Sequence, residues 1–102
     1  MTLHNQVYLL PQARQEVDRL PGNVRQRARQ TIIGLRDDAQ PPHSKRLNYD
    51  AGPMHELWRV RLENWRILYL VDREQERIYV LAARRRPPYQ YEDLDTLVSK
   101  VI

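Results

Sequence analysis

A two-residue polar turn between two strand-like runs restricts this chain to folds that contain an antiparallel hairpin. Residues 56–62 and 65–72 are rich in the aromatic, aliphatic and β-branched residues that favour strands, and Glu63-Asn64 separates them. Two-residue loops are common hairpin connections, and Asn can adopt the positive φ that such loops require. We therefore predict a β-hairpin whose loop is Glu63-Asn64.

This loop determines which side chains share a face, because successive residues of a strand point to opposite sides of a sheet. One face is apolar and aromatic, and it carries Trp58, Val60, Leu62, Trp65, Ile67 and Tyr69. The other face carries Arg59, Arg61 and Arg66, with Arg61 directly across from Arg66. Like charges in such a pair destabilise a sheet by roughly a few tenths of a kcal/mol, so we expect an anion or a carboxylate there. The alternative is a solvated face on which Glu56 or Glu63 pairs with the arginines.

The remaining segments predict an α+β domain. The expected elements are a strand over residues 6–10, helices over 11–20 and 24–35, a short edge strand over 44–48, strands over 56–62, 65–72 and 77–83, and a helix over 92–102. Proline residues separate the helices and stop the second one. We predict an N-terminal strand and a helical hairpin packed on a small antiparallel β-sheet, followed by a short C-terminal helix, as a single domain over residues 1–102.

Arginine dominates the basic residues. Of 17 basic residues, Lys45 and Lys100 alone are lysines, and the formal net charge is +4. A guanidinium binds phosphate through two N–H groups and stacks on bases, so this bias favours a polyanionic partner. Codon usage in a GC-rich genome is the alternative explanation.

Several classes of protein and site are not expected. The chain has no cysteine, which excludes disulfides, thiolate chemistry and cysteine-based metal sites. We find neither metal-ligand spacing nor a Gly-rich phosphate loop, so we expect no metal and no cofactor. We also find no signal peptide and no membrane-spanning run, which predicts a cytoplasmic protein without a membrane partner.

A second basic segment follows the last expected strand. Residues 84–91 combine three arginines, two prolines and two tyrosines. Single-stranded RNA binding uses cations for phosphates and aromatic rings for bases. We predict RNA contacts for Arg84, Arg86 and Tyr89. The alternative is a solvated basic turn whose tyrosines pack on the core.

At these residues the chain resembles the RelE/ParE toxins. The resemblance rests on residues 57–61 and 65–69, the Arg85-Arg86 pair with tyrosines nearby, and the Leu20-Pro21 break between helices, and it extends over nearly the whole chain. It implies the toxin of a type II toxin–antitoxin system, a ribosome-dependent mRNA endonuclease. In that reaction the RNA 2′-hydroxyl attacks the neighbouring phosphate and leaves a cyclic phosphate. The implied partners are the ribosome, mRNA and a cognate antitoxin with an acidic amphipathic segment.

The resemblance also implies site residues. The catalytic set that it assigns is Arg59, Arg61, Arg66, Arg85 and Tyr91. The first two occupy positions that are often lysine in the ribonuclease toxins, and Arg66 matches a phosphate-binding arginine. Tyr91 matches the base-stacking tyrosine, with Tyr89 as its rival. Arg86 competes with Arg85 for the arginine after the last strand, because the Pro87-Pro88 pair departs from the commoner charged spacer.

The general base of this reaction stays open. Arginine keeps its proton at any workable pH and cannot accept one. The candidates are a tyrosinate, Glu63, a histidine and ribosomal RNA, and we expect His55 to be better placed than His4 or His43. Two other functions compete with the endonuclease: a ParE-like, non-catalytic inhibitor of DNA gyrase, and a non-toxic RNA-binding or degenerate toxin module.

Overall fold

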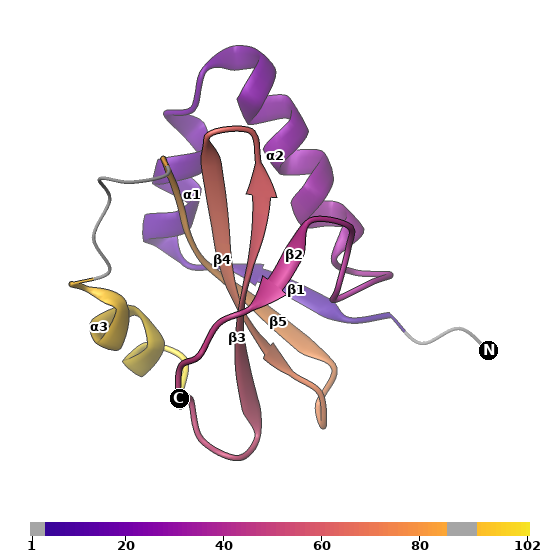
Figure 1. The fold of residues 1–102 in the computed structure, drawn as a ribbon, viewed down its shortest axis with the longest axis vertical. Helices are drawn as coiled ribbons and strands as arrows, with labels where there is room; N and C mark the ends of the chain where they lie inside the picture. The colour runs from indigo at the N-terminus through magenta and orange to yellow at the C-terminus, as the bar shows by residue number, and fades with distance from the viewer. Residues whose placement is uncertain (1–3, 86–91) are drawn as a thin grey trace.

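The computed structural model describes residues 4–85 and 92–102. Over these residues the chain forms a five-stranded sheet with the order β1-β5-β4-β3-β2, together with three helices (Figure 1). In chain order the elements are β1 (Gln6–Leu9), α1 (Pro11–Asp18), α2 (Gly22–Gly34), β2 (Ser44–Arg46), β3 (His55–Leu62), β4 (Trp65–Asp72), β5 (Arg77–Arg85) and α3 (Leu94–Ser99). This is the α+β arrangement that the sequence predicts.

The central hairpin has the predicted register. Trp65 pairs with Leu62 and Ile67 pairs with Val60, which places Arg61 across from Arg66. One detail differs from the prediction: the loop residue with positive φ is Glu63, at 55°. Asn64 is not in the left-handed region, although Asn tolerates that region better than Glu does.

The boundaries of several elements differ from the predicted ones by a few residues. The first strand ends at Leu9 and the first helix at Asp18, while the last helix begins at Leu94. The difference in β5 changes the placement of two predicted site residues: the strand continues through Arg85, because β4 supplies partners for it as far as Trp65. Arg84 and Arg85 therefore belong to the sheet and do not follow it.

Strand β1 lies at one edge and runs parallel to β5. The other pairings, β2 with β3, β3 with β4 and β4 with β5, are antiparallel. Parallel neighbours need a long connection between them. Here that connection includes the α1–α2 hairpin, which packs onto the sheet and begins with Pro11 at the first helical position.

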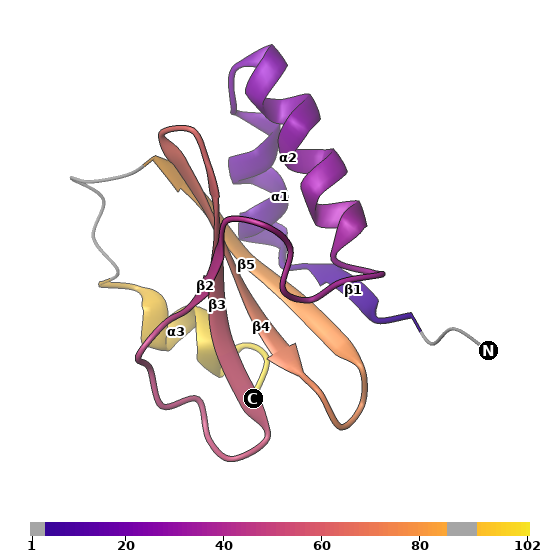
Figure 2. The ribbon, with the colours of Figure 1, turned by 45° about the vertical axis from the view of Figure 1, so that its right-hand side comes forward.

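The sheet is covered on both faces. Figure 2 shows α1 and α2 on one side and α3 on the other. The helical hairpin packs on the apolar face that the register predicts, including Val60, Ile67 and Tyr69. Helix α3 packs on Leu57, Leu68, Leu70 and Leu81 of the second face. Since β4 has a cover on both sides, it carries a continuous apolar run over residues 67–71, whereas polar and apolar residues alternate in the last part of β3, from Arg59 to Leu62.

The arginines of the hairpin lie on the second face, beyond the part that α3 covers. In β3 the residues Leu57, Arg59 and Arg61 follow one another on this face, and Leu57 is the one that contacts the α3 cluster. Within residues 4–85 and 92–102, none of the helices has the length and apolar character that crossing a membrane requires.

Candidate nucleic-acid interface

Three arginines lie in one row across the sheet. Arg61 of β3 pairs with Arg66 of β4, and Arg66 pairs with Arg84 of β5. Residues paired in register share a face, so three guanidinium groups start from the same end of the second face. The repulsion within such a row has to be compensated by other contacts, and each arginine has different ones.

Arg66 is held by the hairpin itself. Its side chain is buried, with 7% of the residue exposed. Nη1 donates hydrogen bonds to the carbonyl oxygens of Glu63 and Trp65, each at 2.9 Å. Arg66 therefore satisfies two backbone acceptors at the turn and contributes to the fold as well as to the charge of the row.

Arg84 is held by two carboxylates. Its Nη1 and Nη2 donate to the two oxygens of Asp93, each at 2.6 Å, and Nη2 also lies 3.2 Å from Glu16 Oε2. The paired Arg84 guanidinium holds the pKa of Asp93 at about 2, and the carboxylates raise the pKa of Arg84 above its usual range. The sequence predicts an RNA contact for Arg84, and in the structure its guanidinium is engaged by these two carboxylates. In this conformation the side chain joins β5 to α1 and to the residue that precedes α3.

This ion pair predicts a pH dependence of stability. The pKa of Asp93 is lower in the folded protein than the ordinary value near 4. The carboxylate therefore contributes stability that is present above about pH 4 and is lost as the pH falls toward about 2. We expect the unfolding temperature to fall over this interval, and to fall less steeply in Asp93→Asn, as measured by circular dichroism. Equal slopes for the two proteins would contradict the prediction.

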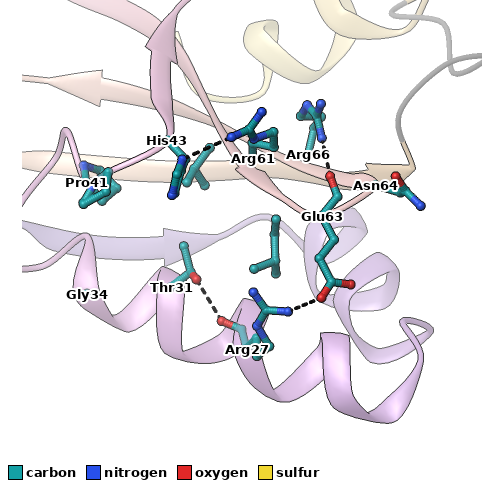
Figure 3. A pocket seen from close by; sticks show the side chains of 12 residues that line it. Arg27, Thr31, Gly34, Pro41, His43, Arg61, Glu63, Asn64 and Arg66 are labelled. Carbon is teal, nitrogen blue, oxygen red and sulfur yellow. Dashed lines mark hydrogen bonds and ion pairs between the residues drawn. The ribbon is translucent and has the colours of Figure 1, made fainter.

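A groove of about 620 Å³ opens beside the row, between α2 and the end of the β3–β4 hairpin. It is lined by Arg27, Thr31, Gly34, Pro41, Pro42, His43, Val60, Arg61, Leu62, Glu63, Asn64 and Arg66. Figure 3 shows Arg61 beside His43 on one side of the groove and Glu63 turned toward Arg27 on the other. Arg27 and Glu63 form an ion pair, while Arg61 Nη2 lies 3.3 Å from His43 Nδ1.

Arg59 and Arg61 are the accessible cations of this face. Arg61 is exposed, and Arg59 lies next to it with Lys45 as its cross-strand neighbour in β2. Arg59 Nη1 contacts the carbonyl oxygen of His43 at 3.5 Å. Arg85 is exposed at the end of β5, across from Trp65. The predicted residues Arg86, Tyr89 and Tyr91 lie outside the described residues.

The predicted order of the histidines is wrong. His55 lies at the opposite end of β3 from Arg61, paired with Asp72 at 3.6 Å. His43, which the sequence ranks lower, lies in the groove. Arg27 in the groove and Lys45 across from Arg59 are further cations of this region that the sequence pattern does not single out. The sequence does contain a weak indication of His43 and Lys45. An edge strand that begins at Ser44 and pairs with β3 places both residues beside β3.

This arrangement can hold a polyanion on exposed guanidinium groups, but it offers no site for a metal. Among the described residues, no three His, Asp or Glu side chains come together as metal ligands would.

Comparison with known families and structures identifies the fold. The family described as "ParE toxin of type II toxin-antitoxin system, parDE" matches residues 7–86 of this chain. The chain belongs to the RelE/ParE toxin family. The family resemblance inferred from the sequence is thereby confirmed. No curated protein sequence matches the chain significantly.

Solved structures of RelE proteins have the same fold. The RelE–RelB complex of Pyrococcus horikoshii matches with a TM-score of 0.73 and 22% identity, over 86% of this chain and 99% of that one. The RelBE2 complex of Mycobacterium tuberculosis matches with a TM-score of 0.67 and 20% identity, over 82% and 100%. A variant of E. coli RelE in the free state matches with a TM-score of 0.66 and 15% identity, over 98% and 100%. At these sequence identities the matches show a shared fold. The chemistry has to be argued from the residues of this chain.

Proposed function

We propose that this RelE/ParE-family toxin is a ribosome-dependent mRNA endonuclease that acts in the cytoplasm and inhibits translation. The observation that carries the proposal is the pair formed by the exposed Arg61 and the half-buried Arg59, on the sheet face that α3 leaves open and beside the groove. Two fixed cations at this spacing suit consecutive phosphates of a single strand. Lys45, the cross-strand neighbour of Arg59, extends the positive charge of this face. Arg85 lies across from Trp65, on the opposite face at the end of β5, and is proposed as a further phosphate contact at that end of the sheet.

In the proposed reaction the RNA supplies its own nucleophile. The 2′-oxygen forms a bond to the neighbouring phosphorus, the bond from phosphorus to the 5′-oxygen breaks, and the products carry a 2′,3′-cyclic phosphate and a 5′-hydroxyl. Arg59 and Arg61 bind the phosphate and stabilise the negative charge that grows in the transition state, which is often the largest catalytic contribution. Tyr91 is proposed to stack on a base, with Tyr89 as its rival and Arg86 as a further RNA contact.

The 2′-hydroxyl proton needs an acceptor other than arginine. Glu63 is paired with Arg27 and His55 lies at the far end of β3, which makes both less suitable than the sequence suggests. A tyrosinate or ribosomal RNA remains available for this step, and the leaving 5′-oxygen takes up a proton in return.

The decisive experiment compares two targets. After induction, cut sites are mapped on ribosome-bound mRNA, and the purified protein is assayed in parallel for inhibition of gyrase supercoiling. Cleavage in the ribosomal A site that is lost in Arg61→Ala supports the endonuclease. Inhibition of gyrase without any mRNA cleavage would support the ParE-like alternative.

We further propose a cognate antitoxin with an acidic, amphipathic segment as the partner. The similar structures from Pyrococcus horikoshii and Mycobacterium tuberculosis are toxin–antitoxin complexes. Here Arg59 and the exposed Arg61 offer charge for acidic side chains, and α3 covers the sheet with a single six-residue helix. An antitoxin helix that displaced α3 would bury the apolar sheet surface that Leu97 now covers.

This partner predicts fast, salt-sensitive association. Raising the ionic strength from about 0.05 M to about 0.5 M should lower the association rate by about tenfold or more, because screening weakens the attraction between exposed charges. Arg59→Ala should reduce this salt dependence, while Arg14→Ala on the opposite side of the sheet should leave it unchanged. Stopped-flow kinetics measure the rate, and hydrogen exchange reports on residues 94–99. A salt-independent rate with unchanged protection of α3 would contradict both parts of the proposal.

A further inference from the structure

His43 has an unusual backbone conformation at the edge of the groove. It directly precedes β2 and has a φ of 69°, in the left-handed region that L-residues rarely adopt. Such conformations are costly and persist where surrounding contacts require them, although histidine tolerates them better than most residues do. Here the contacts between His43 and β3 hold the residue in this conformation.

Both the backbone and the side chain of His43 contact the arginines of β3. Its carbonyl oxygen accepts a hydrogen bond from the backbone N–H of Arg61 at 3.0 Å, and the Arg59 guanidinium reaches the same oxygen at 3.5 Å. Its Nδ1 lies 3.3 Å from Arg61 Nη2. A guanidinium can donate but cannot accept. For this contact to be a hydrogen bond, Arg61 Nη2 donates and His43 Nδ1 accepts, which requires the tautomer whose proton is on Nε2.

We infer that His43 is a positioning residue, which holds the Arg61 guanidinium in place for the phosphate of the cleavage reaction. The inference rests on the proposed function. Arg61 is an exposed side chain with many accessible rotamers, and the acceptor at Nδ1 restricts them before RNA binds. A pre-oriented charge stabilises a transition state better than one that has to be reoriented during the reaction.

The contact requires an uncharged imidazole. The charged groups around His43 are Arg27 of α2, Arg61 of β3 and Arg66 of β4 in the groove, with Arg59 and Lys45 on the adjacent strands. Glu63 is directed at Arg27. Protonation of Nδ1 would replace the acceptor with a donor and add a positive charge beside Arg61. Positioning of Arg61 therefore depends on the unprotonated Nδ1.

Two substitutions distinguish the effect of the His43 side-chain acceptor from the effect of its backbone conformation. His43→Gly removes the acceptor and relieves the strain of the positive φ. His43→Asn retains a short side-chain acceptor and tolerates the same backbone conformation. Both variants should have unfolding temperatures near that of the wild type, so that their activities can be compared directly.

We expect kcat to fall when residue 43 loses its side-chain acceptor and to be retained when an acceptor is kept. On mRNA-programmed ribosomes, His43→Gly should lower kcat by about tenfold with a smaller change in KM, while His43→Asn should remain within about twofold of the wild type. In the Arg61→Ala background, His43→Gly should no longer lower kcat, because the side chain that it positions is gone. Wild-type kcat in His43→Gly would overturn the inference.

A readout that does not depend on cleavage separates this inference from the proposed function. The Arg61 side-chain resonances in ¹⁵N NMR spectra report on its mobility in the free protein. We expect higher mobility in His43→Gly and wild-type mobility in His43→Asn. If the wild type cleaves no mRNA but this pattern appears, the endonuclease proposal fails and the positioning contact stands. If Arg61 is equally mobile in all three proteins, the positioning role is rejected whatever the activity.

Discussion

Arg61→Ala is expected to abolish toxicity and to lower mRNA cleavage by about two to three orders of magnitude, because it removes a preorganised donor from the transition state. The protein should remain folded. Arg61 is exposed and its side chain contacts His43, so little packing is lost. The substitution also removes one half of the like-charged pair with Arg66. Growth after induction at equal protein abundance, cleavage on ribosomes and thermal unfolding measure the three quantities.

Arg66→Ala provides a contrast, because the same loss of charge carries a structural cost. Arg66 is buried and satisfies the carbonyl oxygens of Glu63 and Trp65. Without it, these acceptors lose a charged donor at a cost of about 1–3 kcal/mol. A loss of toxicity in Arg66→Ala therefore has to be interpreted together with the variant's free energy of unfolding. Arg14→Ala, on the face of the molecule that α1 covers, is the matched control and should stay toxic. If Arg61→Ala and Arg66→Ala are both fully toxic at equal abundance, the sheet-face site is wrong.

The largest loss of stability is expected from Arg84→Ala. This substitution leaves the carboxylates of Glu16 and Asp93 without their shared cation. The side chains of Arg84 and Glu16 are 17% and 19% exposed, so solvent screens the pair in part. We expect a cost of about 2–4 kcal/mol, somewhat below that of breaking a fully buried pair. Urea unfolding measures the change in the free energy of unfolding.

The neighbouring residue supplies the control for this prediction. Arg85 is the next residue of β5, is exposed, and carries the same charge. Arg85→Ala should change stability by less than about 0.5 kcal/mol. Because Asp93 precedes α3, Arg84→Ala should also increase hydrogen exchange at Leu97, whose amide bonds to the Asp93 carbonyl oxygen. Equal stabilities for the Arg84 and Arg85 variants would show that the ion-pair network adds nothing to the fold.

Local patterns in the sequence were sufficient to predict the secondary structure and the face of the hairpin. The register of β3 and β4 follows from a two-residue loop and the two-residue period of a strand, both of which act between near neighbours. The helix break at Pro21, the residue before α2, follows in the same way from the fixed φ of proline. These features need no knowledge of what packs against them.

The contacts that decide the roles of individual arginines could not be predicted in this way. The sequence places several arginines together at the site, yet Arg66 is buried on the turn, Arg84 is paired 68 residues away with Glu16, and Arg61 contacts a histidine 18 residues earlier. Nothing in the local pattern of residues distinguishes them. The sequence by itself determined the strand register and the presence of a cationic face, because those depend on short-range geometry. Only the tertiary structure decided which cation is free to bind a partner, because that depends on which carboxylates and carbonyl oxygens the folded chain brings beside each guanidinium.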